Sequence, residues 1–284
     1  MRYQAVAKGE EDKISQALTK LCIEDLTLKV VVDDENKQTL LYGIGEQQLN
    51  IVASKLEDRY KVKIELGKPR IAFRETIKKK AQVQGKHKKQ SGDHGQYGDV
   101  IMEFEPSGDL SKPYEFEEKI FGGAVPRNYF PAVEKGLQES VKAGPLAGYP
   151  VVGIKATLID GSYHPVDSSE MAFKMATILA FKKGFMEAAP VLLEPIVSLT
   201  VTAPDKYSGD IMGDLNKRRG RIMNMTPVDG KQVIEAEVPM AEIYGYSTEL
   251  RSITGGSGDF EYVVSRYEQA PADVQEREMK SNQQ

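Results

Sequence analysis

The sequence contains one cysteine, no tryptophan and only three histidines among its 284 residues. A single cysteine, Cys22, excludes an internal disulfide and favours a reducing compartment such as the cytoplasm. Cys22 falls in an apolar helical pattern, which is typical of a buried thiol and not of a nucleophile. No apolar run approaches the roughly 20 residues that cross a bilayer, and the charged start MRYQAVAKGEEDK does not fit a signal peptide. The composition therefore predicts a soluble globular protein without a membrane partner.

Motifs for nucleotide and covalent chemistry are also missing. The sequence has no GxxxxGK[ST] loop for a nucleoside triphosphate and no GxSxG motif for a serine nucleophile. The histidines His87, His94 and His164 lack the HxH, HExxH or CxxC spacing that is typical of metal sites. Most acidic side chains fall on the solvent faces of expected helices. We therefore expect no catalytic residue, no cofactor and no metal ligand in this chain.

Strand and helix signals follow one order twice. Residues 1–70 alternate as β-α-β-β-α-β, with Ile14, Leu18 and Leu21 at helical spacing. The same order returns from residue 194, where we expect the last helix to cover residues 240–256. This order is that of the ferredoxin-like sandwich.

The predicted fold class is therefore α+β with three domains. Two ferredoxin-like domains, residues 1–70 and 194–272, flank a different α+β domain at residues 71–193. A polar tail, residues 273–284, is expected to fray after a short helical turn.

The middle domain contains an unusual stretch, GKHKKQSGDHGQYGD at residues 85–99. Extended segments border it on both sides, so the pattern predicts a loop at the tip of a long hairpin. The net charge of the chain is −4, so any contact with nucleic acid must come from local patches. Residues 76–91 supply such a patch, because they hold six lysines and no acidic residue.

We predict that this tip binds structured RNA. Lysines suit phosphates, glycines such as Gly95 and Gly98 allow close backbone approach, and the polar side chains can bond to bases or sugars. A second basic cluster ends a helix of the last domain. The candidate contact residues of the two clusters are Lys86, Lys88, Lys89, Gln90, Ser91, Gly92, Asp93, His94 and Gly95, and Lys217, Arg218 and Arg219.

The third histidine lies in GSYHPVDSSEMAF, residues 161–173. Gly161 and Pro165 hold His164 in a short loop, which favours an exposed side chain. Asp167 or Ser168 is expected to cap the following helix, with a glutamate at the capping-box position. His164 is therefore the last candidate contact residue.

Five segments resemble the C-terminal half of the bacterial elongation factor G family of translocation GTPases. They are GKHKKQSGDHGQYGDV, LAGYPVVGIKATLIDGSYHPVDSSEMAFK, PVLLEPI, GDIMGDLNKRRGRI and AEIYGYSTELRSITGG, and together they span essentially the whole chain in the family's order. The resemblance implies that residues 1–70, 71–193 and 194 onward are the third, fourth and fifth domains. It also implies a ribosomal-protein-like fourth domain with a left-handed βαβ crossover, against the usual handedness.

The resemblance also implies partners. The fourth-domain tip, residues 90–95, would enter the decoding region of the small ribosomal subunit and follow the tRNA–mRNA duplex during translocation. His164 matches the position that eukaryotic and archaeal relatives modify to diphthamide. The fifth domain would contact large-subunit RNA near the factor-binding centre. GTP and magnesium would bind a domain that this sequence lacks, so this chain would be a non-enzymatic, monomeric, cytoplasmic module.

Three features depart from the family pattern. The GTP-binding domain and the β-barrel after it are absent, so we expect an expressed fragment or a truncated relative, and favour the fragment. The tip has Gly92-Asp93-His94-Gly95 where the family often has Gly-Gly-Arg-Gly, and the helix start at residues 45–49 lacks a common histidine. The last two features favour a paralogue of the housekeeping factor.

Other functions stay open at this point. The chain could come from a ribosomal-protection factor of the tetracycline-resistance type, whose tip loops eject a drug. It could be a small metal enzyme that uses the three histidines, or a structural adaptor that never touches RNA.

Overall fold

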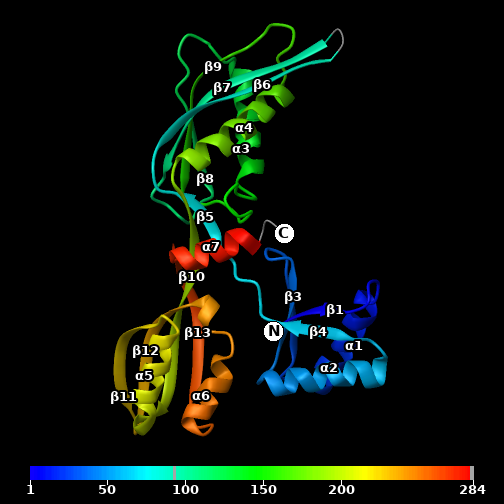
Figure 1. Ribbon diagram of the computed structural model, residues 1–284, viewed down its shortest axis with the longest axis vertical. Helices are drawn as coiled ribbons and strands as arrows, with labels where there is room; N and C mark the ends of the chain where they lie inside the picture. The colour runs from blue at the N-terminus through cyan, green and yellow to red at the C-terminus, as the bar shows by residue number, and fades with distance from the viewer. Residues whose placement is uncertain (92–93, 282–284) are drawn as a thin grey trace. The chain divides into compact units, whose positions relative to one another are not determined.

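The computed structural model describes residues 1–91 and 94–281 (Figure 1). The chain divides into two compact units. One consists of Met1–Ala72 and Pro195–Arg266, and the other of Phe73–Glu194 and Tyr267–Gln284. Each unit therefore combines segments that are distant in the sequence.

The first 67 residues form a ferredoxin-like sandwich, as predicted. Its elements are β1 (Arg2–Ala5), α1 (Glu11–Glu24), β2 (Lys29–Asp33), β3 (Gln38–Tyr42), α2 (Glu46–Tyr60) and β4 (Ile64–Gly67). The antiparallel sheet has the order β2-β3-β1-β4. Leu18 and Leu56 on the two helices and Leu41 on β3 are fully buried between helices and sheet. Cys22 is only partly buried at the edge of this core, and burial raises the pKa of its thiol.

The second sandwich repeats this order with one difference in its last helix. Its elements are β10 (Pro190–Pro204), α5 (Ser208–Lys217), β11 (Arg221–Val228), β12 (Lys231–Pro239), α6 (Tyr246–Thr254) and β13 (Asp259–Gln269). The sheet order is β11-β12-β10-β13. The helix expected over residues 240–256 is interrupted, because Gly245 adopts a left-handed conformation with φ of 76°. Met240–Glu242 forms a separate 3₁₀ turn, and α6 begins only at Tyr246, whose ring is buried in the core.

The middle segment forms a four-stranded sheet with two helices. Its strands are β6 (Ala81–Ser91), β7 (His94–Pro106), β8 (Tyr114–Glu118) and β9 (Ile154–Ser162), in the order β6-β7-β9-β8. The helices are α3 (Phe130–Ser140) and α4 (Glu170–Glu187), which pack on each other, and α4 also packs across β6 and β7. β8 and β9 are parallel and α3 connects them, so this is the crossover for which the resemblance implies a left-handed path.

The stretch 85–99 is not a loop, which corrects the sequence-based expectation. Residues 85–91 belong to β6 and residues 94–99 to β7, and the two strands pair in register from Ala81↔Phe104 to Ser91↔His94. Backbone pairing with a facing strand overrides the weak strand propensity of glycine and lysine. Figure 1 shows the two strands running past the end of α4. Of the candidate tip residues, Gly92 and Asp93 lie outside the described residues.

The C-terminal tail is more ordered than its composition predicts. Ala272–Ser281 forms the ten-residue helix α7, not a short helical turn. Its Val274 is 4% exposed, and Gln275 accepts a hydrogen bond from the Leu192 amide at 3.1 Å. A short strand, β5 (Arg74–Ile77), pairs with the first residues of β10 in the same unit. No helix in the described parts of the chain is long and apolar enough to cross a membrane.

Candidate nucleic-acid interface

Side chains on β6 alternate between the two faces of the hairpin. Gly85 and His87 are buried on the face that α4 covers, whereas Lys86 and Lys88 are exposed on the other face. Lys89 is also exposed. All three lysines of the tip are therefore available to a partner.

His87 has a structural role that its sequence context did not reveal. Only 7% of its surface is exposed, and its Nε2 lies 2.9 Å from Oε1 of Gln96 on the facing strand. Gln96 itself is exposed. The hydrogen bond ties the two strands together near the end of the hairpin.

Three glycines of the hairpin make room for other parts of the protein. A Cβ atom at Gly85 would collide with the carbonyl oxygen of Ala176 in α4, and one at Gly98 with that of Ala172. A Cβ atom at Gly95 would lie 2.7 Å from the Asp167 carboxylate. The lack of a side chain at these three positions is therefore explained by internal packing, and the approach of RNA to the backbone at Gly95 and Gly98 stays a prediction.

Loop 163–168 is hydrogen-bonded directly to β7. The Gly95 amide donates to Oδ1 of Asp167 at 3.1 Å, across 72 positions of sequence. The Tyr97 amide donates to the Asp167 carbonyl at 2.8 Å, and the Ser168 hydroxyl donates to the Tyr97 carbonyl at 2.8 Å. These bonds join the two predicted contact segments into a single surface.

The cap of α4 is one residue later than we expected. The hydroxyl of Ser169 accepts a hydrogen bond from the Ala172 amide at 3.1 Å, whereas Asp167 and Ser168 do not cap the helix. Their side chains instead bond to β7. The helix start thus leaves the two preceding polar residues free to fix the loop.

His164 is exposed at this surface, as predicted, with 51% of its side chain accessible. Its Nδ1 accepts hydrogen bonds from the amides of Val166 at 3.3 Å and Asp167 at 3.1 Å. Because an accepting Nδ1 carries no proton, the proton of the neutral ring is on Nε2. The ring therefore offers a hydrogen-bond donor to a partner.

The structure adds two aromatic residues that sequence reasoning did not select. The Lys86 Nζ lies 5.4 Å from the centre of the Tyr97 ring, and Tyr163 is 48% exposed beside His164. Exposed aromatic rings can stack on unpaired bases. Tyr163 could have been found from its position next to His164 in a short loop between Gly161 and Pro165.

Ser91 and His94 face each other at the last described pair of the hairpin. Gln90, one residue earlier, is exposed and pairs with Gly95. These positions are thus next to the lysines on the same hairpin end.

The three residues of the basic cluster after α5 differ in how accessible they are to a partner. Arg218 donates from Nε to Asp214 Oδ2 at 2.9 Å and from Nη1 to the Glu242 carbonyl at 2.7 Å, and its side chain is 17% exposed. Arg219 is exposed and pairs with Glu242 at 3.3 Å, and Lys217 is exposed. Arg218 therefore holds the second sandwich together, while Lys217 and Arg219 face solvent.

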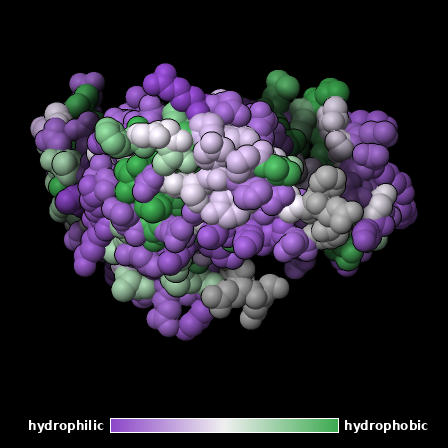
Figure 2. Space-filling model, turned by 90° about the horizontal axis from the view of Figure 1, so that it is seen from above, coloured by the Kyte–Doolittle hydropathy of each residue, from purple (hydrophilic) through white to green (hydrophobic). Residues whose placement is uncertain are grey.

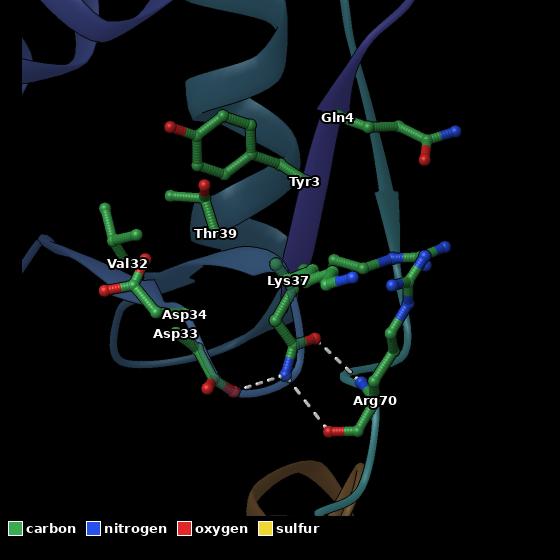
Figure 3. Close-up of a pocket in the computed structure, with 10 residues that line it drawn as sticks. Tyr3, Gln4, Val32, Asp33, Asp34, Lys37, Thr39 and Arg70 are labelled. Atoms are coloured by element: carbon green, nitrogen blue, oxygen red, sulfur yellow. Dashed lines mark hydrogen bonds between the residues drawn. The ribbon is translucent and has the colours of Figure 1, made fainter. Parts of the chain in front are cut away.

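An open cleft of about 390 Å³ lies in the first sandwich (Figure 3). Gln38 lines it and donates to Asp33 Oδ2 at 2.8 Å and to the Arg70 carbonyl at 3.1 Å, while its own oxygen accepts from the Arg70 amide at 2.8 Å. These groups satisfy one another, so the cleft is built by structural hydrogen bonds.

Among the residues that the structure describes, no three His, Cys, Asp or Glu side chains are grouped to hold a metal ion. Hydrophilic residues cover most of the face in Figure 2.

Comparison with known proteins gives a consistent result along the whole chain. Family models match residues 2–68 ("Elongation Factor G, domain III"), 69–189 ("Elongation factor G, domain IV") and 191–278 ("Elongation factor G C-terminus"). Elongation factor G of Fervidobacterium nodosum is 48% identical over 273 residues, which are 96% of this chain and 39% of that protein. A crystal structure from Thermus thermophilus matches with a TM-score of 0.86 and 44% identity, covering 99% of this chain and 42% of that one. The chain thus spans about two fifths of the length of these relatives.

Proposed function

The chain belongs to the elongation factor G family, and from that premise we propose that it acts in translation elongation as a ribosome-binding module. Its hairpin end would enter the decoding region of the small subunit and contact the tRNA–mRNA duplex during translocation. Lys217 and Arg219 would contact RNA of the large subunit. The chain would work in the cytoplasm as a monomer and as a lever without chemistry of its own, since GTP and magnesium would bind elsewhere in a full-length factor.

One observation carries this proposal: two segments distant in sequence form a single fixed end with exposed cations. Loop 163–168 is bonded to β7 through Asp167 and Ser168, and Lys86, Lys88 and Lys89 are exposed on the neighbouring strand. Positive side chains on a rigid protruding hairpin suit the phosphates of structured RNA. Each phosphate contact makes the slope of log affinity against log salt concentration more negative by about 0.7–0.9.

Co-sedimentation with ribosomes at low and near-physiological salt tests the proposal. We expect salt-sensitive binding, and we expect the triple variant Lys86→Glu, Lys88→Glu, Lys89→Glu to bind at least about tenfold more weakly with a shallower salt slope. The physical reason is the loss of up to three phosphate contacts together with new repulsion.

A second triple variant, Lys78→Glu, Lys79→Glu, Lys183→Glu, is the matched control. It changes the net charge equally, and its three lysines are exposed. Lys78 and Lys79 precede β6, whose first residue, Ala81, is about 23 Å along the strand from Lys88 at roughly 3.3 Å per residue. If both triple variants weakened binding equally, general charge and not the hairpin end would explain the affinity. An unchanged salt slope in the first variant would refute the assignment of the tip.

A further inference from the structure

Tyr97 lies at the meeting point of the two segments that form the proposed RNA-binding end. It faces Lys88 across the hairpin, and its backbone amide and carbonyl both bond to loop 163–168. Its side chain is partly buried on the face of the hairpin that carries the exposed lysines.

A chain of hydrogen bonds fixes the Tyr97 hydroxyl. It lies 2.7 Å from the Ser162 hydroxyl, which in turn lies 2.6 Å from Oδ2 of Asp99. A carboxylate only accepts, so Ser162 must donate its single proton to Asp99 and accept from Tyr97. The other oxygen of Asp99 accepts from Nε2 of Gln84 at 2.7 Å. Asp99 is 6% exposed, so the chain ends on a buried carboxylate with both oxygens bonded.

The ring of Tyr97 contacts two candidate RNA-binding side chains. The Lys86 Nζ lies 5.4 Å from its centre, a cation–π distance. The His164 ring lies 6.3 Å away at 56°, within the range of tilted aromatic pairs. Lys86 comes from β6 and His164 from the loop after β9, so one ring contacts both.

We propose that Tyr97 is a positioning residue for RNA binding: its ring holds Lys86 and His164 in place, and the Ser162–Asp99–Gln84 chain holds the ring. This inference rests on the proposed function. A lysine loses much rotamer freedom when it binds a phosphate, and a side chain that is already held in place loses less. Removal of the ring therefore weakens RNA binding through Lys86 without removing any charge.

A double-mutant cycle between Tyr97 and Lys86 tests this coupling in the full chain. Ribosome affinity is measured for Tyr97→Leu, Lys86→Ala and the double variant, at near-physiological salt. We expect Tyr97→Leu to lower the affinity about fivefold in the wild-type background and about twofold or less once Lys86 is alanine, since contacting residues are not additive. Tyr97→Phe keeps the ring and loses the hydroxyl, so we expect it to restore part of the affinity.

Tyr114→Leu is the matched control, because Tyr114 is also partly buried and its hydroxyl also bonds to side chains, those of Glu134 and Gln138. We expect it to leave ribosome affinity unchanged. An independent readout is the NMR signal of the His164 ring protons, which should shift in Tyr97→Leu through the loss of the neighbouring aromatic ring and stay in place in Tyr114→Leu.

The two proposals fail in distinguishable ways. If the triple lysine variant loses binding but the effects of Tyr97→Leu and Lys86→Ala simply add, Tyr97 is not a positioning residue and the proposed function stands. If the triple lysine variant binds like the wild type, the proposed function fails and this inference fails with it. Should Tyr97→Leu not fold, Tyr97→Val, which also removes the ring and suits a strand, replaces it in the cycle, and additivity there overturns the inference.

Discussion

Glu75 is fully buried at the start of the second unit, and both of its carboxylate oxygens accept backbone hydrogen bonds. Oε1 accepts from the amides of Ala147 at 2.8 Å and Tyr149 at 2.9 Å, and Oε2 accepts from the Leu146 amide at 3.0 Å. A buried charge is tolerated when its oxygens are bonded in this way. A single carboxylate thus holds the segment between α3 and β9 in place.

Burial raises the pKa of Glu75 above its ordinary value of 4.5, and the backbone hydrogen bonds oppose this only in part. The folded protein therefore holds a proton at Glu75 more readily than the unfolded chain does. The contribution of Glu75 to stability is fully present below pH 4.5 and is lost as the pH rises through the raised pKa. We predict that the wild type has a higher free energy of unfolding than Glu75→Gln at low pH. This difference should shrink as the pH rises from 4.5 through the raised pKa of Glu75.

Urea unfolding at a series of pH values measures this difference. Glu187→Gln, which changes an exposed glutamate of the same unit, is the control and should show no such trend. An advantage of the wild type that grows with pH would contradict the prediction.

At the scale of elements, α4 approaches the hairpin β6–β7 closely because three glycines are at the contact. Gly85 and Gly98 face the backbone of α4, and Gly184 of α4 faces the Phe104 ring. The helix carries its buried side chains on one face, among them Phe181 and Phe185. Small residues at the contact let the backbones approach, so the hairpin end has a rigid support.

We predict that Gly85→Ala lowers the free energy of unfolding by about 1–3 kcal/mol, the usual cost of overpacking. The added methyl group would collide with the backbone of α4, which cannot move without losing its own packing. Thermal or urea unfolding measures the effect.

Gly213→Ala is the control for this substitution. Gly213 lies inside α5, and an added Cβ there meets nothing within 4 Å. We expect a gain of about 0.5–1 kcal/mol, since alanine is the better helix former. If both substitutions changed the free energy of unfolding equally, the effect of Gly85→Ala would come from backbone conformational freedom and not from close packing.

At the scale of the whole chain, the C-terminal segment returns to the unit that contains residues 73–194. Gln275 of α7 accepts from the Leu192 amide and donates to the Ala270 carbonyl at 2.7 Å. The Tyr149 hydroxyl donates to Glu278 at 2.9 Å. The last helix is therefore fixed by contacts with Tyr149 in the middle of this unit and with Leu192 and Ala270 in its later part.

We predict that Gln275→Ala destabilises this unit by about 1–2 kcal/mol, because it removes two hydrogen bonds and leaves the Leu192 amide without its acceptor. Hydrogen exchange should show faster exchange at Leu192 and no change within the sandwich of residues 1–67. Glu276→Ala removes only an exposed ion pair with Lys280 and is the matched control, with an expected effect below about 0.5 kcal/mol. If the Leu192 amide exchanged at the same rate in both variants, Gln275 would not be the residue that protects it.

The sequence by itself determined the order of elements and the family. The pattern of Leu49, Ile51, Val52 and Leu56 predicted a helix over residues 46–60, the observed bounds of α2, although Ile51 is 56% exposed and not on the buried face. Both ferredoxin-like orders were confirmed by the strand order of the sheets. These features depend on residues that are close in sequence, where periodicity and turn signals act directly. The family followed from motifs that need no three-dimensional information.

The tertiary structure decided which polar residues and glycines are exposed to a partner and which pack inside the protein. Gly98, Asp99 and Arg218 belong to polar or glycine-rich segments that local patterns assign to a surface, yet each contacts residues distant in sequence. His87, in the same kind of segment, is buried within the hairpin. The helical tail is fixed by Leu192, which is 83 positions from its partner Gln275. Such contacts depend on the packing of distant elements, so no local pattern can reveal them.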